Sequence, residues 1–210
     1  MFKNIILNTD SYKASHFLQY PPHTEYVSSY IEARGGEFKQ SVFFGLQAFI
    51  KEYLLTPISQ ADIEEAEALF TLHGVPFNKA GWQYILARYN GYLPVEIQAL
   101  PEGSVCPIRV PMMTITNTKS EFFWLTNYLE TLISCTLWMP CTSATRARLY
   151  KNELKRHAVH TGFPEDVNLD FLCHDFSMRG MAGLEAAIIS GMAHMTSFVG
   201  SETIPAIAAL

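Results

Sequence analysis

Residues 167–195 read VNLDFLCHDFSMRGMAGLEAAIISGMAHM, and this stretch decides the fold class. An apolar run predicts a buried strand, the polar turn HDFSMRG follows it, and a segment rich in small residues predicts a helix. Strand, turn and helix in this order are the unit from which parallel sheets and β/α barrels are built. The last third of the chain therefore predicts the start of such an arrangement.

The polar turn presents Asp175, Phe176 and Arg179 at the carboxyl end of the expected strand, where α/β folds place ligands. Arg179 offers a forked cation that suits phosphate, and Phe176 offers a flat ring for a planar ligand. Asp175 can bind a sugar hydroxyl or orient Arg179. The alternative is a local ion pair of Asp175 with Arg179, with Phe176 in the core. The spacing alone leaves both interpretations open.

The sequence before this stretch mixes strands and helices without an internal repeat. Alternating apolar residues predict short strands in 2–10 and 25–34, and two or three strands in 93–116. Helical spacing and end signals predict helices at 42–55, 59–74, 78–91, 121–138 and 143–160. A composition boundary near Pro164 divides the chain into an expected α+β domain over 1–163 and the first βα units of a barrel over 164–210.

Composition narrows the class of protein. Of the 210 residues, 49% are hydrophobic and 17% are charged, which predicts a packed globular protein and not a disordered one. A net charge of −5 argues against nucleic acid as the main partner. No apolar run is long enough to span a bilayer, and the N-terminal residues do not resemble a secretory signal. Four cysteines without a CxxC pair argue against a zinc ribbon and indicate reduced thiols in the cytoplasm.

Several conspicuous residues receive a structural interpretation. Arg146 and Arg148 can reach a phosphate but fit better on a solvated helix face. His157 and His160 lack a third ligand, so no metal site is assigned. The same structural interpretation applies to an aromatic run expected in the core or in a dimer interface (Phe122, Phe123, Trp124, Tyr128), to two thiols expected to be buried (Cys135, Cys141), and to a partly buried histidine (His194).

Three motifs carry a resemblance: NTDSYKASHFLQYPP (residues 8–22), HDFSMRG (174–180) and SFVGSETIPAI (197–207). Together they resemble the nicotinamide phosphoribosyltransferase family, which belongs to the type II phosphoribosyltransferases. The segments GWQYIL, LPVEIQALPEGSV and WLTNYLETL resemble the same family in the same order. The resemblance therefore covers nearly the whole chain.

The resemblance implies a pentosyltransferase of NAD salvage. Such enzymes join nicotinamide to 5-phosphoribosyl-1-diphosphate and release nicotinamide mononucleotide and pyrophosphate. Mg²⁺ assists the reaction, and ATP hydrolysis through a phosphorylated histidine improves the yield. The implied fold is an α+β N-terminal domain leading into an irregular β/α barrel, in a cytoplasmic homodimer whose active sites lie at the subunit interface.

The resemblance also implies which residues bind substrate. Phe176 matches the aromatic that stacks on one face of nicotinamide, and Tyr12 matches the tyrosine that the other subunit lays on the opposite face. Arg179 matches an arginine near the product phosphate and the ring. Asp10 matches an aspartate that sits with Tyr12. Glu202 matches a position where many members carry an aspartate, whose carboxylate accepts a hydrogen bond from the carboxamide.

Glu202 also bears on the choice of substrate. A carboxylate there repels the carboxylate of nicotinate, which argues against the rival assignment as a nicotinate phosphoribosyltransferase. The glutamate side chain is one methylene longer than aspartate, so the charge and the acceptor are kept while the distance to the amide changes.

The length of the chain departs from the family, whose members are more than twice as long. The resemblance places the phosphorylated histidine, and the acidic residues that hold ribose and magnesium, beyond Leu210. No catalytic residue or metal ligand is therefore assigned, and the chain alone is expected to lack the complete active site. The uncapped apolar end IPAIAAL predicts a fragment, a truncated product or one half of a split enzyme that a C-terminal half completes. The alternative is a non-catalytic module that binds nicotinamide or pairs with a full-length subunit.

Overall fold

A computed structural model describes residues 4–164 and 168–210, and it shows a mixed α/β chain that forms two compact units. Among the described residues, the first unit comprises those up to Ile31, Gln47–Ala99 and Pro111–Cys135. The second unit comprises Glu32–Leu46, Leu100–Val110 and Thr136–Leu210. The domain boundary predicted between residues 163 and 164 divides the chain differently and stays a prediction. Across the described residues, no helix combines the length and the apolar character needed to cross a membrane.

The first unit contains a three-stranded sheet in the order β1-β5-β3, which confirms the strands expected in 25–34 and 93–116. Strand β3 pairs antiparallel with β5, and Val95 lies opposite Asn117. The buried amide of Asn117 accepts a hydrogen bond from the N–H of Val27 at 2.8 Å and donates one to the carbonyl oxygen of Glu25 at 2.8 Å. Asn117 thereby holds the chain that enters β1. The strand bounds are Ser28–Glu32 (β1), Val95–Ala99 (β3) and Pro111–Asn117 (β5).

Two of the predicted helices, α2 (Gln60–His73) and α3 (Lys79–Tyr89), are confirmed with their end signals. The hydroxyl of Ser59 accepts from the N–H of Asp62, and the carboxylate of Asp62 accepts from the N–H of Ser59, which forms a capping box. Gly74 and Asn90 end the two helices in the left-handed conformation that glycine and asparagine tolerate best.

The strand predicted in residues 2–10 is wrong for the residues that the structure describes, and residues 2 and 3 lie outside them. Residues Ile5–Leu7 form the 3-10 helix η1, and Ser11–Leu18 form the 3-10 helix η2. The reason lies in burial, because the adjacent Ile5 and Ile6 are both buried, whereas a strand with one face in the core buries every second residue. The side chain of Asn4 caps η1 by accepting from the N–H of Ile6 at 3.0 Å.

Aromatic rings fill the core of the first unit. Trp82 meets Trp124 and Tyr128 edge to face, with ring centroids 5.0 Å and 5.1 Å apart. The core location predicted for the aromatic run is confirmed for Phe122, Trp124 and Tyr128, which are buried. The 3-10 helix η4 (Ser120–Phe122) delivers this run to the start of the helix that follows.

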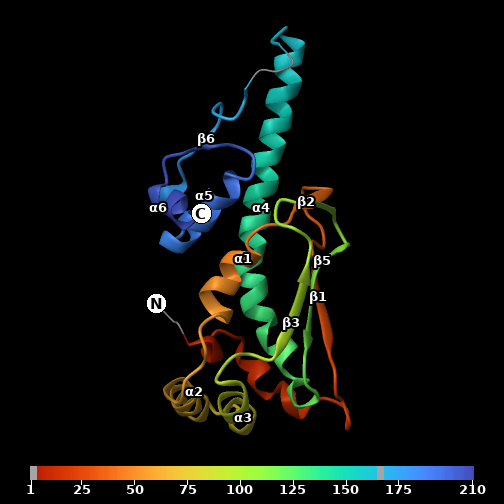
Figure 1. Cartoon of the computed structure of the whole chain (residues 1–210), viewed down its shortest axis with the longest axis vertical. Helices are drawn as coiled ribbons and strands as arrows, with labels where there is room; N and C mark the ends of the chain where they lie inside the picture. Colours follow the sequence, from red (N-terminus) through yellow and green to blue (C-terminus); the bar gives the residue numbers. More distant parts are fainter. Residues whose placement is uncertain (1–3, 165–167) are drawn as a thin grey trace. The chain divides into compact units, whose positions relative to one another are not determined.

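The two helices predicted at 121–138 and 143–160 are one continuous helix, α4 (Leu125–His160), drawn in green to cyan in Figure 1. Pro140 lies inside it, and a proline in a helix interior removes a hydrogen bond at a cost of about 3 kcal/mol. The helix continues because its neighbouring turns are buried through Leu137, Cys141 and Ala144. Burial of those turns offsets the loss at Pro140.

The helix predicted at 42–55 begins later than expected. Strand β2 (Gln40–Val42) precedes it, and helical structure covers α1 (Leu46–Phe49) and the π-helical turn η3 (Ile50–Leu54). Gly45, between strand and helix, has φ +110°, which a helix does not allow. A β-carbon on Gly45 would lie 2.7 Å from Cγ of Pro140, so the missing side chain also makes room for α4.

Among its described residues, the second unit holds two small sheets. Strand β2 pairs antiparallel with β4 (Val105–Pro107), and Val42 of β2 packs in a buried cluster with Phe44, Ala144 and Ala193. Strand β6 (His174–Asp175) pairs in parallel with β7 (Gly200–Ser201), and α5 (Leu184–His194) lies between them in the sequence. This strand, helix and parallel strand confirm one βα unit of the predicted kind. Helix α6 (Ile204–Ala209) follows β7.

The strand expected to be buried before the polar turn is wrong in extent. Phe171 and Leu172 are exposed, and only His174 and Asp175 pair with a neighbour. The reason is that β7 is equally short, so residues before His174 find no partner strand. Val167, the first residue of the quoted stretch, lies outside the described residues.

The contact between Gly45 and Pro140 gives a stability test. We expect Gly45→Ala to lower the free energy of unfolding by about 1–3 kcal/mol more than Gly36→Ala does, because the new methyl group must displace the proline ring. Gly36 is the matched control, since its φ of +124° is similar and a methyl group added there would have no atom within 4 Å. Urea unfolding of both variants measures the difference. Equal losses would mean that backbone strain alone explains the glycine at position 45.

Candidate functional site

The carboxylate of Asp175 joins two turns of the second unit. Its Oδ1 accepts a hydrogen bond from the N–H of Ser177 at 3.0 Å, and its Oδ2 accepts one from Oγ of Ser201 at 3.1 Å. Its backbone oxygen accepts from the N–H of Glu202 at 2.8 Å. The residue is 7% exposed. One buried residue therefore fixes both the turn that carries Phe176 and Arg179 and the turn that carries Glu202.

The environment of Asp175 keeps it ionised. Burial acts to raise the pKa of this carboxyl, but the neighbouring hydroxyls of Thr203, Ser177 and Ser201 and the N–H of Ser177 act more strongly together and lower it below its ordinary value. Oγ of Ser201 also accepts from the N–H of Thr203 at 3.1 Å, which extends the hydrogen-bonded chain to the start of α6.

A glycine on α5 makes room for this carboxylate. A β-carbon on Gly191 would lie 2.7 Å from Oδ2 of Asp175 and 2.6 Å from Cβ of Ala206. The small residues of α5 thus act structurally, since Ala187 and Ala193 are also fully buried. Helix α5 can approach both β6 and α6 only because position 191 has no side chain.

The structure contradicts the structural interpretation of the polar turn, in which Asp175 pairs with Arg179 and Phe176 lies in the core. Phe176 is 70% exposed and therefore does not lie in the core. Arg179, in the 3-10 helix η5 (Ser177–Arg179), is exposed, and the carboxylate of Asp175 accepts from Ser177 and Ser201 and not from a guanidinium. The local ion pair is therefore wrong, and both Phe176 and Arg179 are presented to solvent.

His174 connects Phe176 with Glu202 on this surface. The His174 ring is nearly parallel to that of Phe176, with centroids 6.4 Å apart and an interplanar angle of 27°. Its Nδ1 lies 3.4 Å from Oε1 of Glu202. The sequence did not single out His174, and the signal that identifies it is the parallel pairing of β6 with β7, which the sequence does not reveal. Gly200 lies opposite it, where a β-carbon would come within 2.5 Å of the imidazole.

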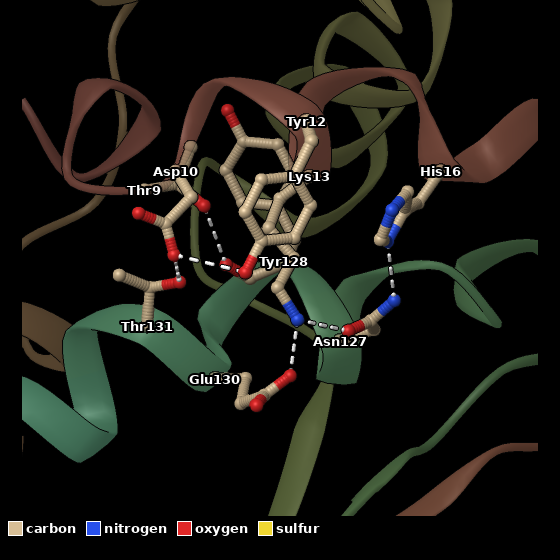
Figure 2. A network of polar contacts seen from close by, with 9 residues as sticks. All are labelled: Thr9, Asp10, Tyr12, Lys13, His16, Asn127, Tyr128, Glu130 and Thr131. Carbon is tan, nitrogen blue, oxygen red and sulfur yellow. Dashed lines mark hydrogen bonds and ion pairs between the residues drawn. The ribbon is translucent and has the colours of Figure 1, made fainter.

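A second group of polar residues lies in the first unit and includes Asp10 and Tyr12 (Figure 2). Oη of Tyr12 donates to Oδ2 of Asp10 at 3.2 Å, and Oγ1 of Thr131 donates to the same oxygen at 2.6 Å. Tyr12 is 56% exposed. Partial desolvation, followed by the charge of Asp10, raises the pKa of Tyr12, so the phenol keeps the proton that it donates.

The segment around Tyr12 has further contacts with the first turns of α4. Nζ of the buried Lys13 donates to Oδ1 of Asn127 at 2.5 Å and forms an ion pair with Glu130. Nδ2 of Asn127 lies 2.9 Å from Nδ1 of His16 (Figure 2). The sequence does not single out these residues. Their signal is the helical spacing of Asn127, Glu130 and Thr131, which places all three on one face of α4.

The five residues predicted to bind substrate thus fall into two clusters. The structure brings Asp10 and Tyr12 together in the first unit, and it joins Phe176 and Glu202 through His174 in the second. Arg179 lies on the turn that begins with Phe176. The second cluster presents an aromatic face, a carboxylate and a guanidinium to solvent, which suits a planar ligand that carries both an amide and an anionic group.

The remaining candidates have structural partners. Arg146 forms an exposed ion pair with Glu37 at 3.5 Å, as expected for a solvated helix face. Nε2 of His194 lies 3.2 Å from the carbonyl oxygen of Cys173, which confirms a satisfied histidine.

Cys141 is buried, and burial raises the pKa of its thiol to about 11. The burial predicted for Cys135 is wrong, because it is exposed on α4. Among the described residues, no group of three or more His, Cys, Asp or Glu side chains is placed to hold a metal ion.

Comparison with known proteins gives concordant matches. Residues 4–97 match the family described as nicotinamide phosphoribosyltransferase, N-terminal domain. The chain is 45% identical to a nicotinamide phosphoribosyltransferase of Xanthomonas campestris pv. campestris over 97% of its own length and 43% of that protein. It is 40% identical to one of Acinetobacter baylyi over 94% of its length and 42% of that protein. The chain therefore spans less than half the length of these curated relatives.

Two solved structures share the fold at low sequence identity. The crystal structure of human nicotinic acid phosphoribosyltransferase superposes with a TM-score of 0.64 at 19% identity, over 93% of this chain and 36% of that chain. Nicotinate-nucleotide pyrophosphorylase from Pyrococcus furiosus superposes with a TM-score of 0.56 at 14% identity, over 98% of this chain and 40% of that chain. Both similarities concern the fold.

The buried carboxylate gives a pH-dependent prediction. Because the pKa of Asp175 is lower in the folded chain than in the unfolded chain, its ionised form stabilises the fold at neutral pH. That contribution is lost as the pH falls below about 4 and through the folded pKa. We expect Asp175→Asn to lower the free energy of unfolding by about 1–3 kcal/mol at pH 7. We expect the difference in unfolding free energy between this variant and the unmodified chain to shrink below about pH 4.

Urea unfolding at pH 7 and at a series of pH values below 4 measures this effect. Glu185→Gln is the matched control, since Glu185 is an exposed carboxylate in the first turn of α5. A loss for Asp175→Asn that stays constant across the series would show that the charge of Asp175 does not stabilise the fold.

Proposed function

We propose that the chain, whose residues 4–97 match the nicotinamide phosphoribosyltransferase N-terminal domain, supplies the nicotinamide-binding part of such an enzyme. The proposed reaction transfers the phosphoribosyl group of 5-phosphoribosyl-1-diphosphate to the ring nitrogen of nicotinamide. The products are nicotinamide mononucleotide and pyrophosphate, a step of NAD salvage in the cytoplasm. The observation that carries the proposal is the exposed cluster of Phe176, Arg179 and Glu202, whose two turns Asp175 holds together.

Each residue of the cluster has a proposed role. Phe176 stacks on one face of the pyridine ring, and its high exposure leaves that face open to a ligand. Glu202 accepts a hydrogen bond from the carboxamide NH₂, and Arg179 binds the phosphate of the product as a forked donor. Tyr12 of a second subunit covers the opposite face of the ring, and Asp10 holds that tyrosine. The functional assembly is therefore proposed to be a homodimer.

The βα unit made by β6, α5 and β7 is proposed to be the first part of an irregular β/α barrel. The parallel pairing of β6 with β7 supports this, because it places both site-bearing turns after the carboxyl ends of their strands. Mg²⁺ is proposed to neutralise the diphosphate, and ATP to act through a phosphorylated histidine. The described residues include no metal-binding group. The ligands of Mg²⁺ and the phosphorylated histidine are therefore proposed to lie outside this chain.

Nicotinate phosphoribosyltransferase is the closest alternative within the class, since a structure of that activity shares the fold. The carboxylate of Glu202 disfavours it, because two negative charges would meet in the same site. A different alternative is a non-catalytic module that binds nicotinamide, or that pairs with a full-length subunit through the segment around Tyr12.

A single-turnover assay separates these functions. The purified chain is mixed with nicotinamide, 5-phosphoribosyl-1-diphosphate and Mg²⁺, and nicotinamide mononucleotide is measured by mass spectrometry. Binding of nicotinamide alone is followed in parallel by NMR titration. Binding with turnover supports the enzyme, and binding without turnover supports a part that needs a C-terminal half or a binding module. Absence of binding by the folded chain would overturn the proposal.

The stacking role of Phe176 predicts a large effect on nicotinamide affinity. Loss of one stacking face costs about 1–3 kcal/mol, so Phe176→Ala should weaken nicotinamide binding by roughly 5- to 150-fold. Phe163→Ala is the matched control, since Phe163 is an exposed phenylalanine of the same unit outside the cluster. NMR titration of both variants gives the two dissociation constants. Equal affinities would exclude Phe176 as the stacking residue.

The charge of Glu202 predicts an effect on substrate choice. Glu202→Gln keeps an acceptor for the carboxamide and removes the negative charge that repels nicotinate. We expect the preference for nicotinamide over nicotinate to fall by roughly tenfold or more, mainly because nicotinate binds better. Competition between the two ligands measures this ratio. An unchanged ratio would show that another group selects the amide.

A further inference from the structure

Tyr12 receives its direct contacts from its own segment of the chain. Its hydroxyl donates to Asp10, its ring is tilted against His16 with centroids 5.3 Å apart, and Nζ of Lys13 lies 5.6 Å from the ring centroid. The N–H of Lys13 also donates to the backbone oxygen of Asp10 at 2.9 Å. The orientation of the exposed ring therefore depends on what holds residues 10–16 in place.

Three side chains of α4 hold this segment (Figure 2). Asn127 and Glu130 bind the ammonium group of Lys13, and Asn127 also contacts the imidazole of His16. These contacts anchor the side of the segment that faces the core, since Lys13 is buried. Neither Asn127 nor Glu130 contacts Asp10, which is exposed.

Thr131 supplies the contact at Asp10. Its Oγ1 donates to Oδ2 of Asp10 at 2.6 Å, and the same oxygen accepts the Tyr12 hydroxyl at 3.2 Å. Both hydrogen bonds end on one charged oxygen, and hydrogen bonds to a carboxylate are stronger than neutral ones. Without the threonine hydroxyl, the Asp10 side chain can rotate, and the bond that directs the Tyr12 hydroxyl rotates with it.

We propose that Thr131 is a positioning residue that acts through Asp10 to hold the ring of Tyr12 at a fixed angle for stacking on nicotinamide. This inference rests on the proposed function, in which Tyr12 covers one face of the ligand. Thr131 itself does not touch the ligand. Its hydroxyl links the rigid helix α4 to an exposed aromatic whose direct contacts come from its own segment.

The chain offers a matched set of substitutions. Thr131→Val keeps the shape and removes the hydroxyl, whereas Thr131→Ser keeps the hydroxyl. Thr126→Val makes the same change five residues earlier on α4, where the fully buried hydroxyl has no hydrogen-bond partner among the described residues. The comparison therefore separates loss of the contact with Asp10 from any general effect of valine on the helix.

The first readout is hydrogen exchange of the peptide that contains residues 10–16, measured by mass spectrometry on the full chain. We expect Thr131→Val to raise exchange in this peptide by roughly 3- to 10-fold, while Thr131→Ser and Thr126→Val leave it close to that of the unmodified chain. Exchange in the peptide that contains residues 60–73 should be the same in all four proteins. Unchanged exchange in residues 10–16 would overturn the anchoring role of Thr131.

The second readout is the affinity for nicotinamide, measured by NMR titration. Thr131→Val should weaken it by roughly 3- to 10-fold because the stacking face is no longer preorganised, and Thr131→Ser should restore it. If the unmodified chain binds nicotinamide and Thr131→Val binds it equally well, the positioning role is overturned and the proposed function stands. If the unmodified chain does not bind nicotinamide, both the proposed function and the substrate part of this inference fail.

Discussion

Helix α4 contributes buried side chains to each of the two units, and the core of each unit depends on them. In the first unit, Trp124 and Tyr128, at and just after the start of this helix, pack edge to face against Trp82. In the second unit, Ala144 lies in the buried cluster with Val42 and Phe44. A proline in the middle of a helix usually ends or kinks it. Here the buried turns around Pro140 and the missing side chain of Gly45 stabilise the continuous form.

The two clusters of candidate site residues are held by different physical means. Asp175 is a buried carboxylate whose hydrogen bonds tie two turns together, and its low pKa keeps it ionised. Asp10 is exposed, and its position is set by the hydroxyl of Thr131 on a helix that is anchored in the core. A buried anchor favours a rigid surface around Phe176 and Glu202. In the first cluster, the orientation of the exposed Tyr12 ring therefore depends on the hydrogen bonds that end on Asp10.

The proposed preference for nicotinamide over nicotinate follows from the negative charge of Glu202. Glu202 lies beside His174, at 3.4 Å between Oε1 and Nδ1, so the longer side chain has a partner that fixes its direction. An aspartate at this position would be one methylene shorter and would not extend as far along the same direction. The contact with His174 therefore supports the proposed role of Glu202 as the acceptor of the amide hydrogen bond.

The sequence by itself determined the ends of α2 and α3 and the chemical groups that the polar turn carries. Ser59, Gly74 and Asn90 predicted ends of α2 and α3, because capping depends on residues close together in the chain. The motif HDFSMRG predicted a ligand-binding turn, and the motifs together predicted the family.

Only the tertiary structure decided the features that depend on residues far apart. It showed that α4 continues through Pro140, that β6 is limited by its short partner β7, and that Asp175 contacts Ser201 rather than Arg179. It also placed His174 beside Glu202 and Thr131 beside Asp10, because contacts between distant parts of the chain arise from packing and leave no periodic signal in the sequence.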